Sequence, residues 1–262
     1  PVGMEIFSPG LLRVGSGERV QFNRFGNLIH FGNTQTQDTF QSTSVNRFFN
    51  ENEIKKMISQ NPEIRKIMVP NKMPVKLNME ELHNLQQNHC KDTQEIATNI
   101  AANLPPALKS KVNLKDLKDG AMLHDFGKAL IPQEILNKNG ALTEEEHRIM
   151  DLHSELGYQL LKNSGVNDEV LKLVRFHHNN FEKAKQSYIA DVNLQILNLA
   201  DKYSALTEKR VYKEPFSPKK ALTILYGDVK KGEVHPFIFQ ALVKSLRSEE
   251  HTSELQSPRY LV

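Results

Sequence analysis

One short stretch of the sequence places an imidazole, a carboxylate and an ammonium group within about one turn of an α-helix: His124, Asp125 and Lys128 of MLHDFGK. A histidine followed by an aspartate is common by chance, so this pair alone indicates little. Further histidine and aspartate residues of interest occur at His89, His153, His177, His178 and Asp201. Neutral imidazole and carboxylate are suitable ligands for iron, manganese or zinc. The sequence therefore raises the question of whether the fold brings these residues together.

The elements that would position these residues are predicted to be helices. From Asn78 to Leu104 apolar residues recur at steps of three and four, and two prolines end the pattern. Capping-box spacings occur at Asn50 with Glu53 and at Asn78 with Glu81. Further helices are predicted over residues 113–126, 143–162, 167–178, 191–207, 217–226 and 235–246. The expected fold class is mainly α, a helical bundle.

The candidate ligands lie on the apolar faces of these helices. In the first helix the series 82, 85, 89, 93, 96 and 100 places His89 on the side that faces the core. In the second helix apolar residues at 114, 117 and 121 lead to His124 and Asp125, and Gly127 is placed to end the helix. Similar positions in the later helices are occupied by His153, His177, His178 and Asp201.

Burial of these polar groups needs an explanation, because a buried polar group without a partner is costly. Taken singly, each residue has an ordinary one: a core histidine bound to a carbonyl, an aspartate paired with a basic residue, or a histidine pair half-exposed at a helix end. For all of them together, the simplest explanation is that the helices converge and the residues share metal ions.

The composition limits the possible classes of protein. The chain has 262 residues, 39% of them hydrophobic and 25% charged, which suits one medium-sized soluble domain and a smaller one. Without an apolar run that could span a membrane or a secretory leader, we expect a cytoplasmic protein with no membrane partner. The single cysteine, Cys90, excludes an intramolecular disulfide and a cysteine-based zinc site. A net charge of +3 is too small to indicate nucleic acid. The oligomeric state is open.

Three segments are expected along the chain. Residues 1–75 begin with a glycine-rich part in which Val20–Phe25 and Leu28–Phe31 are predicted to pair as strands; a regulatory role is one interpretation. Residues 76–246 form the helical domain. Residues 247–262 begin RSEEHTSELQS, which resembles a translated sequencing adapter, so we interpret them as an artefactual tail, with a native polar tail as the alternative. The absence of an initial methionine suggests a fragment.

A family resemblance rests on these residues and the segments around them. His89, LHDFGKALIPQEILNKNGALTEEEHRIMDLHSELGYQLL (123–161), the His177-His178 pair and LADKYSALTEKRVYKEPFSPKKAL (199–222) resemble the HD-GYP branch of the HD-domain metal-dependent phosphohydrolases. The resemblance covers about residues 78–226. It implies an HD-domain helical bundle that hydrolyses the cyclic dinucleotide cyclic di-GMP with a metal-activated water. It also implies a centre of two or three metal ions, usually iron or manganese.

The resemblance assigns roles to individual residues. Metal ligation is implied for His89, His124, Asp125, His153, His177, His178 and Asp201. Asp125 would bridge two metals, and Lys128 would offer its charge to a phosphate oxygen, so both are candidate catalytic residues. Arg210 and Lys213 would contact substrate phosphates, although both could equally belong to an ordinary basic surface.

Two departures from the family pattern bear on the substrate and on the number of metals. The loop after the histidine pair should carry a Gly-Tyr-Pro signature, but the chain reads HHNNFEKAKQSYIADVN there (177–193) and lacks it. Leu85 stands where some members have a glutamate that holds a third metal, so two metals are expected. The predicted function is a metal-dependent phosphodiesterase acting on a cyclic dinucleotide. The alternatives are a catalytically degenerate nucleotide-binding signalling module and an HD phosphohydrolase that acts on another nucleotide.

Overall fold

The protein is described by a computed structural model that covers residues 49–179, 191–208 and 214–255, with only the backbone at 248–255, and the backbone of four strands nearer the N-terminus. Contacts divide the chain into two units, Pro1–Ser44 and Val45–Val262, and each is described by itself. In the first unit the strands form an antiparallel sheet in chain order: β1 (Glu5–Ser8), β2 (Leu11–Arg13), β3 (Arg19–Phe22) and β4 (Leu28–Phe31). The β3–β4 pair corresponds to the two strands expected from the sequence, and residues 23–25 of the first expected strand lie outside the described residues.

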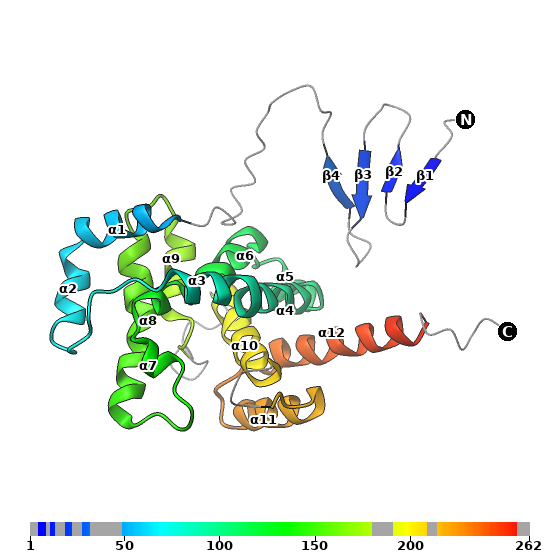
Figure 1. Ribbon diagram of the computed structural model, residues 1–262. Helices are drawn as coiled ribbons and strands as arrows, with labels where there is room; N and C mark the ends of the chain where they lie inside the picture. Colours follow the sequence, from blue (N-terminus) through cyan, green and yellow to red (C-terminus); the bar gives the residue numbers. More distant parts are fainter. Residues whose placement is uncertain are drawn as a thin grey trace. The chain divides into compact units, whose positions relative to one another are not determined.

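The second unit is helical, which confirms the predicted fold class for this part of the chain (Figure 1). Its first half contains α1 (Glu51–Gln60), α2 (Pro62–Met68), α3 (Met79–Leu85), the π-helical turn η1 (Gln86–Cys90), α4 (Lys91–Ala102), α5 (Pro106–Lys109), α6 (Leu114–Leu123) and the 3₁₀ turn η2 (Phe126–Leu130). Its second half contains α7 (Gln133–Leu136), α8 (Glu144–Leu161), α9 (Asp168–Phe176), α10 (Val192–Thr207), α11 (Pro218–Lys230) and α12 (Pro236–Leu255).

Several helix ends follow from capping side chains. The predicted capping box of Asn50 and Glu53 is formed at the start of α1, with both reciprocal hydrogen bonds. At α3 the Asn78 side chain accepts a hydrogen bond from the Glu81 backbone N–H. The helix predicted over residues 217–226 continues to Lys230, and the one predicted to end at 246 continues to Leu255, into the tail that we interpret as artefactual.

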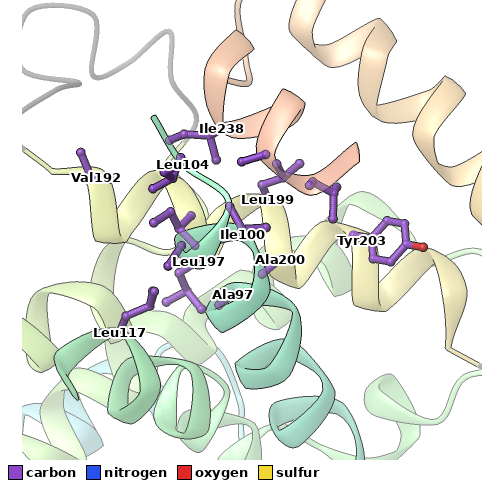
Figure 2. Close-up of a cluster of buried hydrophobic side chains, with 14 of the residues drawn as sticks. Ala97, Ile100, Leu104, Leu117, Val192, Leu197, Leu199, Ala200, Tyr203 and Ile238 are labelled. Carbon is purple, nitrogen blue, oxygen red and sulfur yellow. The ribbon is translucent and has the colours of Figure 1, made fainter. Parts of the chain in front are cut away.

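The first hydrophobic cluster joins α4, α6, α10, α11 and α12 (Figure 2). Ala97 and Ile100 of α4 pack with Leu117 of α6, Leu197 of α10 and Ile238 of α12, and all of them are buried. This cluster fixes α10, which carries Asp201, against α4 and α6. His89 lies in the turn directly before α4, and His124 directly follows α6.

The second hydrophobic cluster joins α1, α2, α8, α9 and η2. Its fully buried members include Ile54 of α1, Ile64 of α2, Phe126 of η2 and Leu156 of α8. The candidate ligands come from helices of both clusters, so the two cores together determine their arrangement.

The boundary between the two units falls after Ser44, about thirty residues before the boundary expected at residue 75. The reason is that α1 and α2 bury apolar residues in the second cluster, so they pack as part of the helical unit. Asn61, between these helices, also donates a side-chain hydrogen bond to the backbone oxygen of Gln159 in α8 at 2.7 Å.

Among the helices of the described residues, none combines the length and the apolar character that crossing a bilayer requires.

Candidate metal centre

Three imidazoles meet where α8 packs against the end of α9. His153 lies in α8, and His177 and His178 follow the last residue of α9. The Nε2 atom of His153 is 3.2 Å from Nε2 of His177 and 3.1 Å from Nε2 of His178. His153 and His177 are buried, whereas His178 is exposed, although its sequence position predicted an inward-facing residue. We call these three residues the imidazole group.

A second group of ligand-type residues comes from η1, the end of α6 and the middle of α10. His89 Nε2 is 3.0 Å from Asp201 Oδ1, and His124 Nε2 is 3.6 Å from the same oxygen. His89 and His124 are buried, and Asp201 is 14% exposed. We call these three residues, His89, His124 and Asp201, the carboxylate group.

Asp125 lies between the two groups and is 2% exposed. Its Oδ1 atom is 3.3 Å from His153 Nε2 of the imidazole group. Its Oδ2 atom is 3.5 Å from both His89 Nε2 and His124 Nε2. One carboxylate therefore directs a different oxygen at each group.

Lys128 follows Asp125 by three residues and its Nζ atom lies 2.6 Å from Asp125 Oδ2. Burial lowers the pKa of Lys128, but the charges of Asp125 and Asp201 outweigh burial, and the pKa is raised. The ammonium is therefore positively charged, and the side chain remains 19% exposed. It is held on a carboxylate and also reaches the surface.

The protonation of the two groups differs. Burial and the nearby charge of Lys128 lower the pKa of His153 to about 3, and burial lowers the pKa of His177. The pKa of His178 is also lowered, because its ring is partly desolvated where it contacts His153 although the residue reaches the surface. Burial alone would lower the pKa of His89, but contacts with Asp201 and Glu208 and the charge of Asp125 raise it to about 9. The imidazole group is therefore neutral at pH 7, whereas His89 carries a proton.

Both carboxylates are ionised. Burial raises the pKa of Asp125, but its interactions with Lys128 and then with the neighbouring histidines outweigh burial and hold the pKa well below its usual value. Burial opposes ionisation of Asp201 as well, and the adjacent His124 and His89 again lower the pKa well below normal. The negative oxygens of Asp125 and Asp201 thus lie beside the positive charges of His89 and Lys128.

The ring nitrogens of three histidines have a fixed role. Nδ1 of each lies within hydrogen-bond distance of the backbone oxygen three residues earlier: His124 with Ala121 at 2.7 Å, His153 with Met150 at 2.6 Å and His177 with Val174 at 2.8 Å. Because a carbonyl can only accept, Nδ1 must carry the proton, and in a neutral ring Nε2 is left with its lone pair. The Nε2 atoms of His153 and His177 therefore present two lone pairs to each other.

This arrangement fits a metal ion. Two facing lone pairs repel, and the buried Nε2 of His124 has no hydrogen-bond partner among the described residues. Candidate ligand atoms lie within 4.8 Å of one another in His153, His177 and His178, and likewise in His89, His124 and Asp125. Imidazole nitrogens and carboxylate oxygens are ligands of divalent transition metals. The described residues thus contain two clusters that could hold metal.

The local backbone explains how His89 reaches the centre. The sequence predicts one regular helix from Asn78 to Leu104, but η1 interrupts it with a π-helical turn that contains His89. The wider turn shifts the buried face, so Gln86 is buried and Leu85 only partly buried, in contrast to the predicted series. His89 nevertheless points inward, as predicted.

Gly127 has a different role from the one predicted. The helix that should end at Gly127 ends at Leu123, and Gly127 lies in the 3₁₀ turn that follows Asp125. A Cβ atom at Gly127 would overlap the backbone oxygen of His153, and it would lie 2.5 Å from the backbone nitrogen of Gly157. The glycine therefore permits the close approach of η2 to α8, which brings Asp125 to His153.

The structure brings together the seven predicted ligands, with Lys128 beside them. Arg210 and Lys213, predicted to contact phosphates, lie outside the described residues, and so do residues 180–190 of the segment that lacks the Gly-Tyr-Pro signature. Sequence analysis missed three residues of α10 and its end that contact the ligands. These are Asn198, Ser204 and Glu208.

Asn198 connects the two groups through the backbone. It is buried, and its Nδ2 donates a hydrogen bond of 2.6 Å to the backbone oxygen of His177. This bond satisfies a carbonyl at the end of α9 and fixes the turn that holds His177 and His178 against α10. A polar residue three positions before Asp201, inside an apolar face, is the sequence signal that could have identified it.

Comparison with known proteins places this geometry in context. The HD domain family matches residues 87–206. RpfG of Xanthomonas campestris pv. campestris, named a cyclic di-GMP phosphodiesterase response regulator, is 32% identical over 125 residues, which are 45% of this chain and 33% of that protein. A 3'3'-cGAMP-specific phosphodiesterase of Vibrio cholerae is 27% identical over 142 residues, 52% of this chain and 33% of its own length. The chain thus spans about a third of these curated relatives.

Among solved structures, the HD domain of the phosphodiesterase PgpH from L. monocytogenes, in complex with cyclic-di-AMP, aligns with a TM-score of 0.48 and 20% identity. The alignment covers 68% of this chain and 99% of that one.

Proposed function

We propose, from the premise that residues 87–206 are an HD domain, that this chain is a metal-dependent phosphodiesterase which hydrolyses a cyclic dinucleotide. One observation supports the proposal most directly. Asp125 directs Oδ1 at the imidazole group and Oδ2 at the carboxylate group, as a carboxylate shared by two cations would.

The two groups would each hold one divalent cation, iron or manganese, and share Asp125. The imidazole group supplies His153, His177 and His178, and the carboxylate group supplies His89, His124 and Asp201. Cations in these positions would supply Lewis acidity and lower the pKa of a bound water toward neutrality. Leu85 has no carboxylate to offer a third cation, which supports two cations rather than three.

The remaining residues of the site would act on the substrate. Lys128 is charged, partly exposed and beside Asp125, so its ammonium can bind a non-bridging phosphate oxygen and offset negative charge that develops there. Arg210 and Lys213 are proposed to hold a second phosphate, because both are basic and follow Asp201 closely in the sequence. Two phosphate contacts suit a substrate with two phosphodiesters.

The names of the relatives support the substrate class. RpfG is named for cyclic di-GMP and the Vibrio cholerae relative for 3'3'-cGAMP, and both substrates are cyclic dinucleotides. Because the Gly-Tyr-Pro signature is absent, we assign the substrate only to the class of cyclic dinucleotides and not to particular bases.

The test is a product assay combined with metal analysis. Protein ending at Leu246 is prepared free of metal, reconstituted with Mn²⁺ or Fe²⁺, and incubated with cyclic di-GMP, 3'3'-cGAMP, cyclic-di-AMP and a set of nucleoside mono- and triphosphates. We expect about two ions per chain and a linear dinucleotide product. Asp125→Ala should reduce turnover about 10³-fold or more, and Glu169→Gln, an exposed surface change, should leave it intact.

Fewer than about one bound transition metal per chain would contradict the proposal. A second candidate function is a nucleotide-binding signalling module without turnover, which the missing Gly-Tyr-Pro signature favours. Tight cyclic di-GMP binding without product, unchanged by His124→Ala, would support that module. Hydrolysis of only mono- or triphosphates would instead indicate an HD phosphohydrolase for another nucleotide.

A further inference from the structure

His89 is held differently from the other buried histidines of the site. His124, His153 and His177 each direct Nδ1 at a carbonyl of their own helix. His89 instead directs Nδ1 at two side chains from another element: Ser204 Oγ at 3.2 Å and Glu208 Oε2 at 3.5 Å. Its orientation therefore depends on side chains that the sequence analysis did not single out.

The two partners of His89 share one face of α10 with a candidate ligand. Asp201, Ser204 and Glu208 follow one another at spacings of three and four residues, so they line the same side of the helix and its C-cap. Asp201 contacts Nε2 of His89, while Ser204 and Glu208 contact Nδ1. Side chains from one face of α10 and its C-cap thus contact both ring nitrogens of His89.

We propose that Glu208 is a positioning residue for His89, assisted by Ser204; this inference rests on the proposed function. A histidine that binds a cation through Nε2 keeps its proton on Nδ1. A carboxylate and a hydroxyl at Nδ1 fix that tautomer and the ring orientation, and the negative charge increases the basicity of Nε2. Glu208 acts on the cation of the carboxylate group through His89 and does not touch the substrate.

The expected effect is selective. Loss of such a partner typically reduces metal affinity about 10–100-fold. Because Glu208 contacts His89, a member of the carboxylate group, the reduction should fall on the cation of that group. The cation held by His153, His177 and His178 should bind as in the wild type.

The experiment compares Glu208→Ala, Glu208→Asp and Ser204→Ala in the full chain, using Zn²⁺ and Mn²⁺ as probes. Chelator competition gives the two affinities, and long-range ¹H–¹⁵N spectra of the Zn²⁺-loaded protein report which ring nitrogen carries the proton. Glu208→Ala should weaken one of the two sites about 10–100-fold and alter the His89 Nδ1 signal. Glu208→Asp should recover part of the affinity, and Ser204→Ala should show a smaller loss in the same site.

A matched control is Glu155→Gln, because Glu155 is also partly buried but pairs with Arg175 instead of an imidazole. It should leave both affinities within about twofold of the wild type. Equal affinities and an unchanged His89 signal in Glu208→Ala would overturn the positioning role and leave the proposed function standing. A wild-type protein that binds no metal would overturn both, and a uniform loss at both sites, with a lower melting temperature, would show a structural role instead.

Discussion

The imidazole group and the carboxylate group are built from similar residues but prepared differently for a cation. In the imidazole group, burial keeps the rings neutral, and two Nε2 lone pairs already face each other. In the carboxylate group, the ionised Asp201 and the shared Asp125 lie beside the His89 imidazolium and the Lys128 ammonium. A cation entering the first group meets free lone pairs, whereas one entering the second must displace protons or positive charge.

Asp125, the carboxylate shared by the two groups, has positive partners within the protein. Asp125 is almost fully buried, and an ionised carboxylate in that position needs close positive partners. Lys128 provides one at 2.6 Å, and His89 is close enough to contribute a second. The ionised Asp125 and Asp201 are thus accompanied by two positive groups, Lys128 and His89.

The largest expected effect separates the two groups by removing one ligand from each. His153→Ala and His89→Ala should each reduce the metal content from about two ions to about one per chain. The ion that remains should differ: the carboxylate group keeps its cation in His153→Ala, and the imidazole group keeps its cation in His89→Ala. Both variants should lose turnover about 10³-fold, because each destroys one half of the site.

Metal analysis and electron paramagnetic resonance of Mn²⁺-loaded protein check this comparison, since coupled Mn²⁺ pairs and single ions give different spectra. The exposed His83→Ala serves as the control for loss of a surface histidine. If either variant releases both ions together, the groups do not bind independently and the comparison fails.

The next effect concerns the junction between the groups. Gly127→Ala should destabilise the fold by about 3 kcal/mol, because the new Cβ would overlap the backbone of α8 at His153. Thermal and urea unfolding measure the change. Gly227→Ala is a matched control, since Gly227 lies within α11 with open space around its Cβ position, and alanine there should be neutral or stabilising by up to about 1 kcal/mol. Equal stabilities of the two variants would contradict the tight approach of η2 to α8.

The smallest expected effect is the number of protons released when a cation binds. The pKa of His89 is about 9 and that of His153 about 3 in the metal-free protein. At pH 7.5 cation binding should therefore release about one proton from His89 and none from His153, and at pH 10 the release from His89 should fall to about a tenth of a proton. Calorimetry in buffers of different ionisation enthalpy measures the number. His89→Ala should abolish the release at pH 7.5, and an undiminished release in that variant would assign the proton to another group.

The same raised pKa has a consequence for the stability of the metal-free protein. A histidine with a folded pKa of about 9 and an ordinary value of 6.5 stabilises the fold fully below pH 6.5. That contribution is lost as the pH rises through 9. The imidazole group has the opposite sign, because its lowered pKa values cost stability as the pH falls below 6.5.

Periodicity was sufficient to predict the longer helices and the inward direction of the buried ligands, but not the short elements α5, η2 and α7. His89, His124, Asp125, His153 and His177 are buried as expected, because ligand and apolar positions share one helical face. The π-helical turn at His89 could not be predicted, since it depends on packing against α6 and α10 and not on local propensity. For the same reason Gly127 was interpreted as a helix end, although its role is contact with a distant helix.

The supporting residues were harder to predict than the ligands. Asn198, Ser204 and Glu208 act on backbone or side chains about twenty or more residues away in sequence, so no local pattern identifies their partners. Their common position on α10 becomes informative only when His89 and His177 are known to lie beside that helix.

The bond between the His177 ring and the Val174 carbonyl has a consequence for the order of α9 itself. The last carbonyls of a helix lack an amide donor from the next turn, and here the imidazole N–H takes the place of that donor. A cation on the other nitrogen would draw electron density from the ring and make the N–H a stronger donor. A cation bound to His177 would therefore strengthen this cap and reduce fraying of the last turn of α9.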